Sequence, residues 1–346
     1  MTPAPGDAGP AGVPGKPSGS RRMIHILGAG LVAVVLPVVV AYLLLGKLGS
    51  VAVVMGLVVG VLGSKLGGTR RMLYLAPAVG VAGGLGAITA YHWSWAVLLA
   101  VTAVIAGAGM RFGWLPPLLM LAFSATFPVA TSSARHAAAY GAITAIATLY
   151  GIVLARRFQA PEIVEGQRVS LPAAAAVAVV FGVALGGAAA IGVALGWTEP
   201  YWVPEPILIL IVYVLVGKRE RIPEKAIGTA LGVILVVPVA IAALPAWAVY
   251  VLAGAAFLLA FWQRKTYWRF YGLYTFALVL VLAPPGQAGS EAAHRGSEIL
   301  IGIAILAVGL TILYPLGTWQ SKHHPEPELA DSDEPAESPK QPSPSS

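Results

Sequence analysis

Twelve apolar segments, most of them close to the length of a membrane-spanning helix, occupy most of the chain between residues 23 and 314. A spanning α-helix needs about 20 mostly apolar residues, with roughly 17 to 25 tolerated. The predicted spans form two sets, residues 23–45, 49–63, 72–91, 95–110, 115–130 and 137–154, and residues 171–195, 203–216, 227–244, 246–262, 271–283 and 297–314. The sequence therefore predicts an all-α polytopic membrane protein with about 12 transmembrane helices. Because several segments are short, ten spans with re-entrant pieces is the alternative.

The composition excludes an ordinary soluble globule. The chain is 58% hydrophobic and 11% charged, whereas about a quarter of the residues in a soluble domain are charged. It has no cysteine, and its only aspartates are Asp7, Asp331 and Asp333, near the two ends. Thiol chemistry and an acidic metal cluster therefore have no residues in the membrane body. We expect no enzymatic activity, no catalytic residue, no metal and no cofactor.

Polar stretches divide the chain into five parts. Residues 1–20 and 321–346 are rich in Pro, Gly, Ser and charge, which is typical of disordered tails. The stretch 155–170 is the longest polar segment of the body. We therefore expect a first membrane repeat at 21–154, a cytoplasmic linker at 155–170 and a second membrane repeat at 171–320.

Weak internal similarity predicts that the two membrane parts are parallel six-helix repeats. In each half a basic loop precedes a helix with two glycines spaced by four, Gly80 with Gly84 and Gly228 with Gly232. In each half an arginine also precedes the last span, and a glycine follows it six or seven residues later, Arg135 with Gly141 and Arg295 with Gly302. An even number of spans per repeat gives both repeats the same orientation.

The distribution of basic residues predicts the topology. With the amino terminus in the cytoplasm, 19 of the 22 Lys and Arg residues lie on the cytoplasmic side, and Lys47, Arg135 and Arg295 lie outside. Basic residues accumulate on the cytoplasmic side of membrane proteins. We expect a multi-pass protein of the plasma (inner) membrane with both termini cytoplasmic. Anionic lipids explain the basic loops, so no nucleic-acid partner is expected, and a homo-oligomer stays open.

The candidate binding residues fall at the two ends of the predicted spans. Tyr201, Trp202 and Pro204 precede the eighth span, whose first free N–H groups favour an anion, although Tyr and Trp are also common as interfacial belt residues. Glu205 reads as a helix cap. At the inner end, Lys225, Gly228 and Thr229 belong to a basic loop and a closely packed helix.

A second outer cluster holds charge. Arg295 and Glu298 can pair locally on the twelfth span, or Arg295 can join Arg135 at the mouth of an anion path. Spans five and eleven are broken by proline at Pro128 and Pro284–Pro285, and broken helices in matched positions mark binding sites in repeated transporters. All eight glutamates of the body read as loop or helix-end residues, so no central carboxylate is expected as a proton relay.

Three motifs resemble the membrane domain of the fusaric acid resistance family, within the aromatic acid exporter group, to which plant aluminium-activated malate transporters are also similar. They are Tyr201-Trp202-x-Pro204, Lys225-x-x-Gly228-Thr229-x-x-Gly232 and Arg295-x-x-Glu298-x-x-x-Gly302. The chain departs from the family in having Lys225 where Arg is usual. A 16-residue linker also stands where a large soluble domain often occurs.

The resemblance implies export of organic, often aromatic, anions, with proton coupling in many members. From the outer aromatic and cationic rim and the broken helices, together with these motifs, we expect the substrate-binding residues to be Tyr201, Trp202, Pro204, Lys225, Gly228, Thr229, Arg135, Arg295 and Glu298. Three alternatives stay open at this point: a passive anion channel, a membrane scaffold subunit that transports nothing, and an intramembrane enzyme acting on a lipid-linked substrate.

Overall fold

A computed structural model describes the backbone of residues 19–157, 168–197, 199–215, 221–242, 244–263, 265–282 and 288–323. It describes the side chains in these ranges except at 19–31, 246, 261, 282, 288–295 and 314–323. The predicted tails and linker lie largely outside the described residues. At their edges, helices begin at Gly19 and end at Arg157 and His323.

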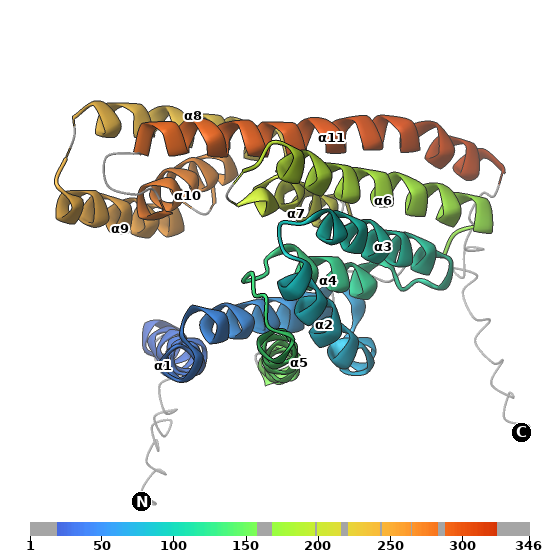
Figure 1. Cartoon of the computed structure of the whole chain (residues 1–346), viewed down its shortest axis with the longest axis horizontal. Coiled ribbons are helices and arrows are strands. Elements are labelled where there is room, and N and C mark those ends of the chain that lie inside the picture. Colours follow the sequence, from blue (N-terminus) through green and yellow to red (C-terminus); the bar gives the residue numbers. More distant parts are fainter. Residues whose placement is uncertain are drawn as a thin grey trace, which may run out of the picture.

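The described part of the chain is all helical, with eleven α-helices, two short 3-10 helices and no strand (Figure 1). The first half holds α1 (Gly19–Gly67), α2 (Thr69–Thr89), α3 (Trp93–Gly109), η1 (Met110–Phe112), α4 (Leu115–Thr126) and α5 (Ala134–Arg157). The second half holds α6 (Leu171–Ala194), η2 (Pro200–Trp202), α7 (Pro204–Leu215), α8 (Arg221–Ile241), α9 (Ala246–Trp262), α10 (Tyr267–Leu282) and α11 (Ala288–His323).

Each of the twelve predicted segments overlaps a helical segment. The first two are the two parts of α1, which is broken at Gly46, where φ is 60° and ψ is −147°. Only glycine adopts this backbone conformation readily, because it has no Cβ. The positions of the helices are therefore confirmed.

Helix length limits how many of these segments cross a membrane unaided. Seven described helical segments are long and apolar enough, Val32–Gly67, Thr69–Thr89, Trp93–Phe112, Ala134–Arg157, Leu171–Ala194, Arg221–Ile241 and Gly296–Leu313. By contrast, α4 and α7 have 12 residues each, or about 18 Å of helix against a hydrocarbon core of about 30 Å. The number of spans stays a prediction.

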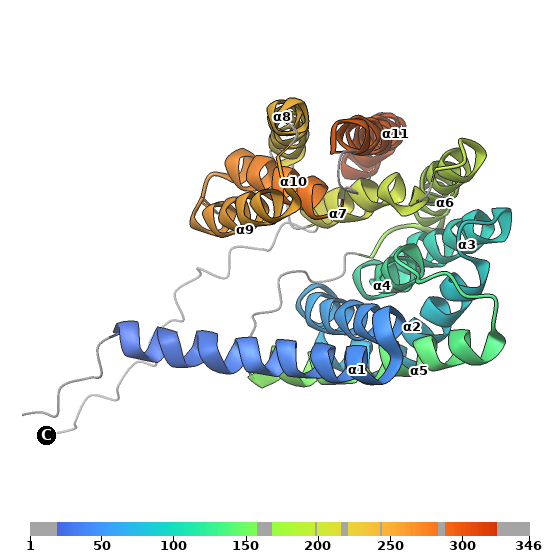
Figure 2. The same cartoon turned by 60° about the vertical axis from the view of Figure 1, so that its left-hand side comes forward.

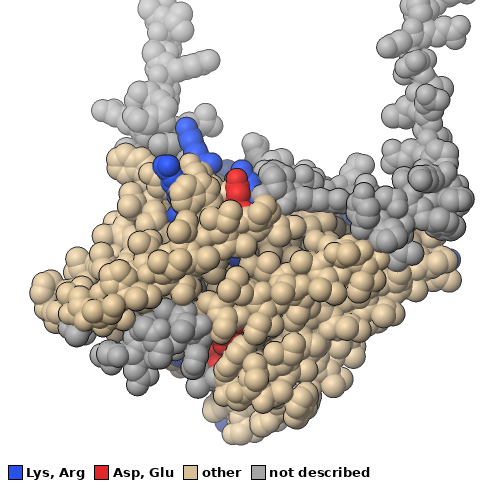
Figure 3. Space-filling model, turned by 90° about the horizontal axis from the view of Figure 1, so that it is seen from above, with Lys and Arg blue, Asp and Glu red and all other residues tan. Residues whose placement is uncertain are grey.

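The surface is that of a multi-pass membrane protein. Large apolar side chains are widely exposed, including Leu43 and Trp262, and such extensive exposed apolar surface marks contact with lipid. Figure 3 shows a face on which the described surface is almost uncharged, with Lys and Arg gathered mainly at one edge.

The two halves meet chiefly where α3 packs along α6, and α4 also touches α7 (Figures 1 and 2). Equivalent pairs pack in both halves: α2 with α4 and α5 in the first, and α8 with α10 and α11 in the second. The paired glycines do not follow this rule, because Gly80 meets Gly141 on α5 whereas Gly228 meets Gly272 on α10. The parallel repeat therefore stays a prediction.

The elements that build the site lie in the second half. Helix α7 lies at its centre, between α6 and α10 in both views (Figures 1 and 2). Proline stands at the start of α7, at Pro204, where its missing N–H breaks no helical hydrogen bond. Gly228 and Gly232 allow α8 to pack directly on the backbone of α10, which brings the polar side chains of the two helices together.

Candidate functional site

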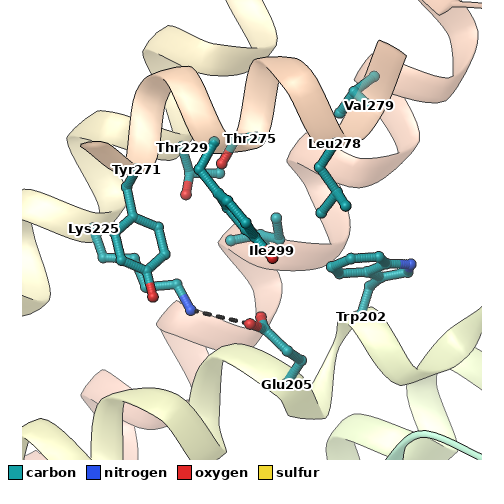
Figure 4. Close-up of a pocket in the computed structure, with 10 residues that line it drawn as sticks. Trp202, Glu205, Lys225, Thr229, Tyr271, Thr275, Leu278, Val279 and Ile299 are labelled. Atoms are coloured by element: carbon teal, nitrogen blue, oxygen red, sulfur yellow. Dashed lines mark hydrogen bonds and ion pairs between the residues drawn. The ribbon is translucent and has the colours of Figure 1, made fainter. Parts of the chain in front are cut away.

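A small enclosed pocket lies where η2, α7, α8, α10 and α11 converge (Figure 4). Its lining combines two charged residues, three aromatic rings, two threonines and three aliphatic side chains, namely Glu205, Lys225, Trp202, Tyr271, Tyr274, Thr229, Thr275, Leu278, Val279 and Ile299. On α10, the lining positions 271, 274, 275 and 278 share one helical face, because the last three lie three, four and seven residues after the first. The pocket is therefore a product of helix packing rather than of a loop.

Lys225 and Glu205 form a buried ion pair at the base of the pocket. The Lys225 Nζ donates a hydrogen bond to Glu205 Oε1 at 3.4 Å. The Lys225 side chain is 2% exposed and that of Glu205 is 12% exposed. Figure 4 shows the two side chains pointing toward one another, between Trp202 and Tyr271.

This pair is costly to bury. Removing an ion from water costs several kcal/mol, and well-packed apolar residues often stabilise a core as well as a buried pair does. Losing one partner costs more, about 3 to 5 kcal/mol, because the other charge stays buried alone. A lysine and a glutamate at these positions are therefore better explained by a binding function than by stability.

Aromatic rings of α10 accompany the basic residues of α8. The Arg221 guanidinium lies 4.8 Å from the Tyr267 ring centre, and Lys225 Nζ lies 5.1 Å from that of Tyr271. The second pair lies one helical turn beyond the first on both helices. A cation over a ring face is attracted by the ring's quadrupole, so α8 and α10 present an aromatic and cationic surface that suits an aromatic anion.

Thr229 contributes a buried hydroxyl to the same pocket. Its side chain is 1% exposed, and its Oγ1 has no hydrogen-bond partner among the described residues. Helical threonines usually donate to the carbonyl four residues earlier, as Thr144 does to Tyr140 O at 2.8 Å. Thr229 does not, which leaves its hydroxyl available to a ligand in the pocket.

The pocket is small in this conformation. The centre of a water molecule can reach about 20 Å³ of it, which is room for about one water, whereas sites for drug-sized molecules occupy about 300 to 1,000 Å³. An organic anion can enter only if the surrounding helices separate.

Comparison with known proteins places this pocket in a recognised region. Residues 187–309 match the family model described as fusaric acid resistance protein-like. No curated protein and no solved structure matches the chain. Every residue that lines the pocket lies within the fusaric acid resistance-like region. Together with the apolar helices, the match indicates a membrane transporter-like protein.

Three of the predicted site residues meet in the pocket of the fusaric acid resistance-like region. Trp202, Lys225 and Thr229 all line it, although the sequence had placed Trp202 at the outer end and the other two at the inner end. The Trp202 Nε1 donates to Glu199 Oε2 at 3.1 Å, which fixes the indole at the rim. These residues come together because α7 is short and its first turn lies beside the first turns of α8.

Three other predicted residues support the pocket without lining it. The Tyr201 ring packs against Tyr91 and Phe127 of the first half, at centroid distances of 6.5 and 5.6 Å. Pro204 is buried at the start of α7, and Gly228 lies in the contact between α8 and α10.

Of the predicted outer charge cluster the structure describes the side chains of Arg135 and Glu298, and neither lines this pocket. Arg135 is exposed on α5, which packs against α1 and α2. The side chain of Arg295 lies outside the described residues. Glu298 is 2% exposed on α11, next to the lining residue Ile299.

The expectation that no central carboxylate serves as a proton relay stays a prediction, but two of the glutamates, Glu205 and Glu298, are buried within the protein. Glu205 lies in the first turn of α7, as the sequence indicates, whereas Glu298 lies ten residues into α11, which begins at Ala288. The α10 side chains of the pocket were missed altogether. The signal that could have found them is the spacing of Tyr267, Tyr271 and Tyr274 along one face of a largely apolar helix.

Proposed function

We propose that this protein is a carrier in the plasma (inner) membrane that exports organic anions, aromatic carboxylates above all, through the pocket around Lys225. The observation that supports this most directly is a buried lysine between Trp202 and Tyr271. A carboxylate would bind the Lys225 ammonium, and the attached ring would stack on the aromatic side chains. Membrane lipids and the organic anion are then its partners, with both termini cytoplasmic.

The small volume of the pocket supports a carrier over a passive channel that is open in this conformation. A channel needs a continuous water-filled path, whereas this pocket holds about one water molecule between five helical elements. In a carrier such a small pocket is one state of a cycle in which the site opens to each side in turn. Trp202 of the first motif and Lys225 and Thr229 of the second line this pocket, which also argues against a scaffold that transports nothing.

The test is flux of radiolabelled 4-hydroxybenzoate in liposomes that contain the full chain, with protein-free liposomes as background. Replacing Lys225→Gln should reduce the apparent affinity about 10- to 100-fold, because a hydrogen bond to a charged group is lost. Lys225→Arg keeps the charge and should retain most of the flux. Lys265→Gln is the matched control, since Lys265 is exposed in the turn between α9 and α10.

Two results would count against the proposal. Flux that is the same for Lys225→Gln and the unaltered chain would remove the pocket from the transport path. Flux that rises linearly with concentration, without saturation, would favour a channel.

A further inference from the structure

Glu205 occupies the place that a bound carboxylate would take. Its carboxylate lies 3.4 Å from the Lys225 ammonium, which is the one cation among the described lining residues of the pocket. The distance exceeds the roughly 2.7 to 2.9 Å of a strong charge-assisted hydrogen bond. The glutamate and the lysine also belong to different helices, α7 and α8. Separation of these helices would break the pair and free Lys225.

We propose that Glu205 is a tethered counter-ion: it neutralises Lys225 when no substrate is bound, and the carboxylate of an organic anion replaces it when substrate binds. This inference rests on the proposed function, because it assigns a role to Glu205 within the same transport site.

The role follows from the charge of the site during a transport cycle. A carrier that achieves net export of an anion without carrying another substrate inward must return with its site empty, by the same alternating movement. With substrate bound, the buried Lys225 is paired with the substrate carboxylate. Without substrate it would be an unpaired buried cation, which is unfavourable, unless the protein supplies an anion of its own. Glu205 supplies that anion, so the empty carrier can return and net export becomes possible.

Thr229 adds a second contact for the incoming carboxylate. Its buried hydroxyl lines the pocket and has no partner among the described residues, one helical turn beyond Lys225 on α8. A substrate carboxylate has two oxygens, so one can accept from Lys225 and the other from Thr229. The tethered glutamate makes the first contact, whereas no hydrogen bond joins it to Thr229. The free anion is therefore able to displace it.

A rescue experiment tests the replacement directly. Glu205→Gln leaves Lys225 without its carboxylate and should lower the thermal unfolding temperature of the detergent-purified full chain. Added 4-hydroxybenzoate should raise that temperature more in Glu205→Gln than in the unaltered chain, since a ligand stabilises the state it binds. Purification in the same anion should recover a variant that folds poorly without it.

Flux measurements test the role in the cycle. Exchange of external for internal 4-hydroxybenzoate needs only the loaded carrier, whereas net efflux also needs the empty carrier to return. In Glu205→Gln, exchange should persist at a lower half-saturating concentration. Net efflux should fall by about tenfold or more relative to exchange, because the empty site then carries an unpaired charge. Glu224→Gln is the matched control, because Glu224 pairs with Arg221 at 2.8 Å outside the pocket.

The outcomes separate the inference from the proposed function. Equal stabilisation of both proteins by the anion, or an equal loss of exchange and net efflux in Glu205→Gln, would overturn the tethered counter-ion. If the unaltered chain does not transport the anion but the anion still rescues Glu205→Gln, the proposed transport function would be wrong. The replacement of Glu205 by a free carboxylate at Lys225 would still be supported.

Discussion

We expect the Thr229 hydroxyl to strengthen substrate binding without stabilising the fold. A buried hydroxyl without a partner costs about 1 to 3 kcal/mol, and Thr229 carries this cost inside the pocket. Thr229→Val keeps the shape and removes the hydroxyl, so we expect the unfolding temperature to be unchanged or higher. The half-saturating concentration of 4-hydroxybenzoate should rise about tenfold, because a hydrogen bond to a carboxylate is lost.

Thr144→Val provides the control for this prediction. Thr144 is also buried, but it lies on α5, and its hydroxyl donates to Tyr140 O. Its loss should leave the half-saturating concentration unchanged. An unchanged value for Thr229→Val as well would show that the hydroxyl does not contact the substrate.

At the residue scale, the sequence indicated half of the ion pair. Lys225, Thr229 and Trp202 could be selected because they stand out in apolar surroundings and belong to motifs. Glu205 was interpreted as a cap, because a glutamate in a first helical turn interacts favourably with the helix dipole wherever that turn lies. Only the fold reveals that α8 and α10 cover this turn. The contact between Glu205 and Lys225 spans 20 residues of sequence, and no local pattern encodes it.

At the scale of elements, glycine determines how closely α8 and α10 pack. A Cβ at Gly228 would lie 2.5 Å from Trp268 O and 2.9 Å from Tyr271 Cβ. We expect Gly228→Ala to force the helices apart, to destabilise the protein by about 1 to 3 kcal/mol and to reduce flux by moving Tyr271 away from Lys225. Unfolding in detergent and liposome flux measure the two effects.

Gly254→Ala is the matched control, since a Cβ at Gly254 of α9 would meet nothing within 4 Å. This change should leave stability unchanged or slightly raised, because alanine has the higher helix propensity. Equal behaviour of the two variants would mean that α8 and α10 can separate without cost.

The elements themselves were the most predictable part of the fold. Hydropathy predicted the position of every α-helix. A helix satisfies its backbone polar groups with its own hydrogen bonds, so an apolar stretch in a membrane protein indicates a helix. Hydropathy did not resolve the lengths. The predicted fifth span, residues 115–130, contains a helix that ends at Thr126, because Pro128 disfavours helical backbone at the residue before it.

At the scale of the whole molecule, the segment after α4 shows how non-helical backbone can be held among the helices of the first half. The non-helical residues 127–133 are joined to surrounding helices by hydrogen bonds from Tyr140 Oη to Phe127 O, Tyr91 Oη to Pro128 O and Thr131 N to Ala87 O. Irregular backbone is tolerated at membrane depth only where protein groups satisfy it in this way. Helix α4 and the first residues of this segment make up the predicted fifth span, residues 115–130.

Positions before and after α4 provide a test of the topology. We expect Phe112, before α4, to lie on the cytoplasmic side and Ser132, after it, to lie outside. The chain has no cysteine, so Phe112→Cys and Ser132→Cys, both at exposed positions, each introduce a single thiol. In intact cells, a membrane-impermeant maleimide should label Ser132→Cys at once and Phe112→Cys only after permeabilisation. Labelling of both from the same side would make α4 re-entrant and reduce the twelve predicted spans. The reversed labelling pattern would show that the protein has the opposite orientation. The excess of Lys and Arg would then lie outside, contrary to the usual accumulation of basic residues on the cytoplasmic side.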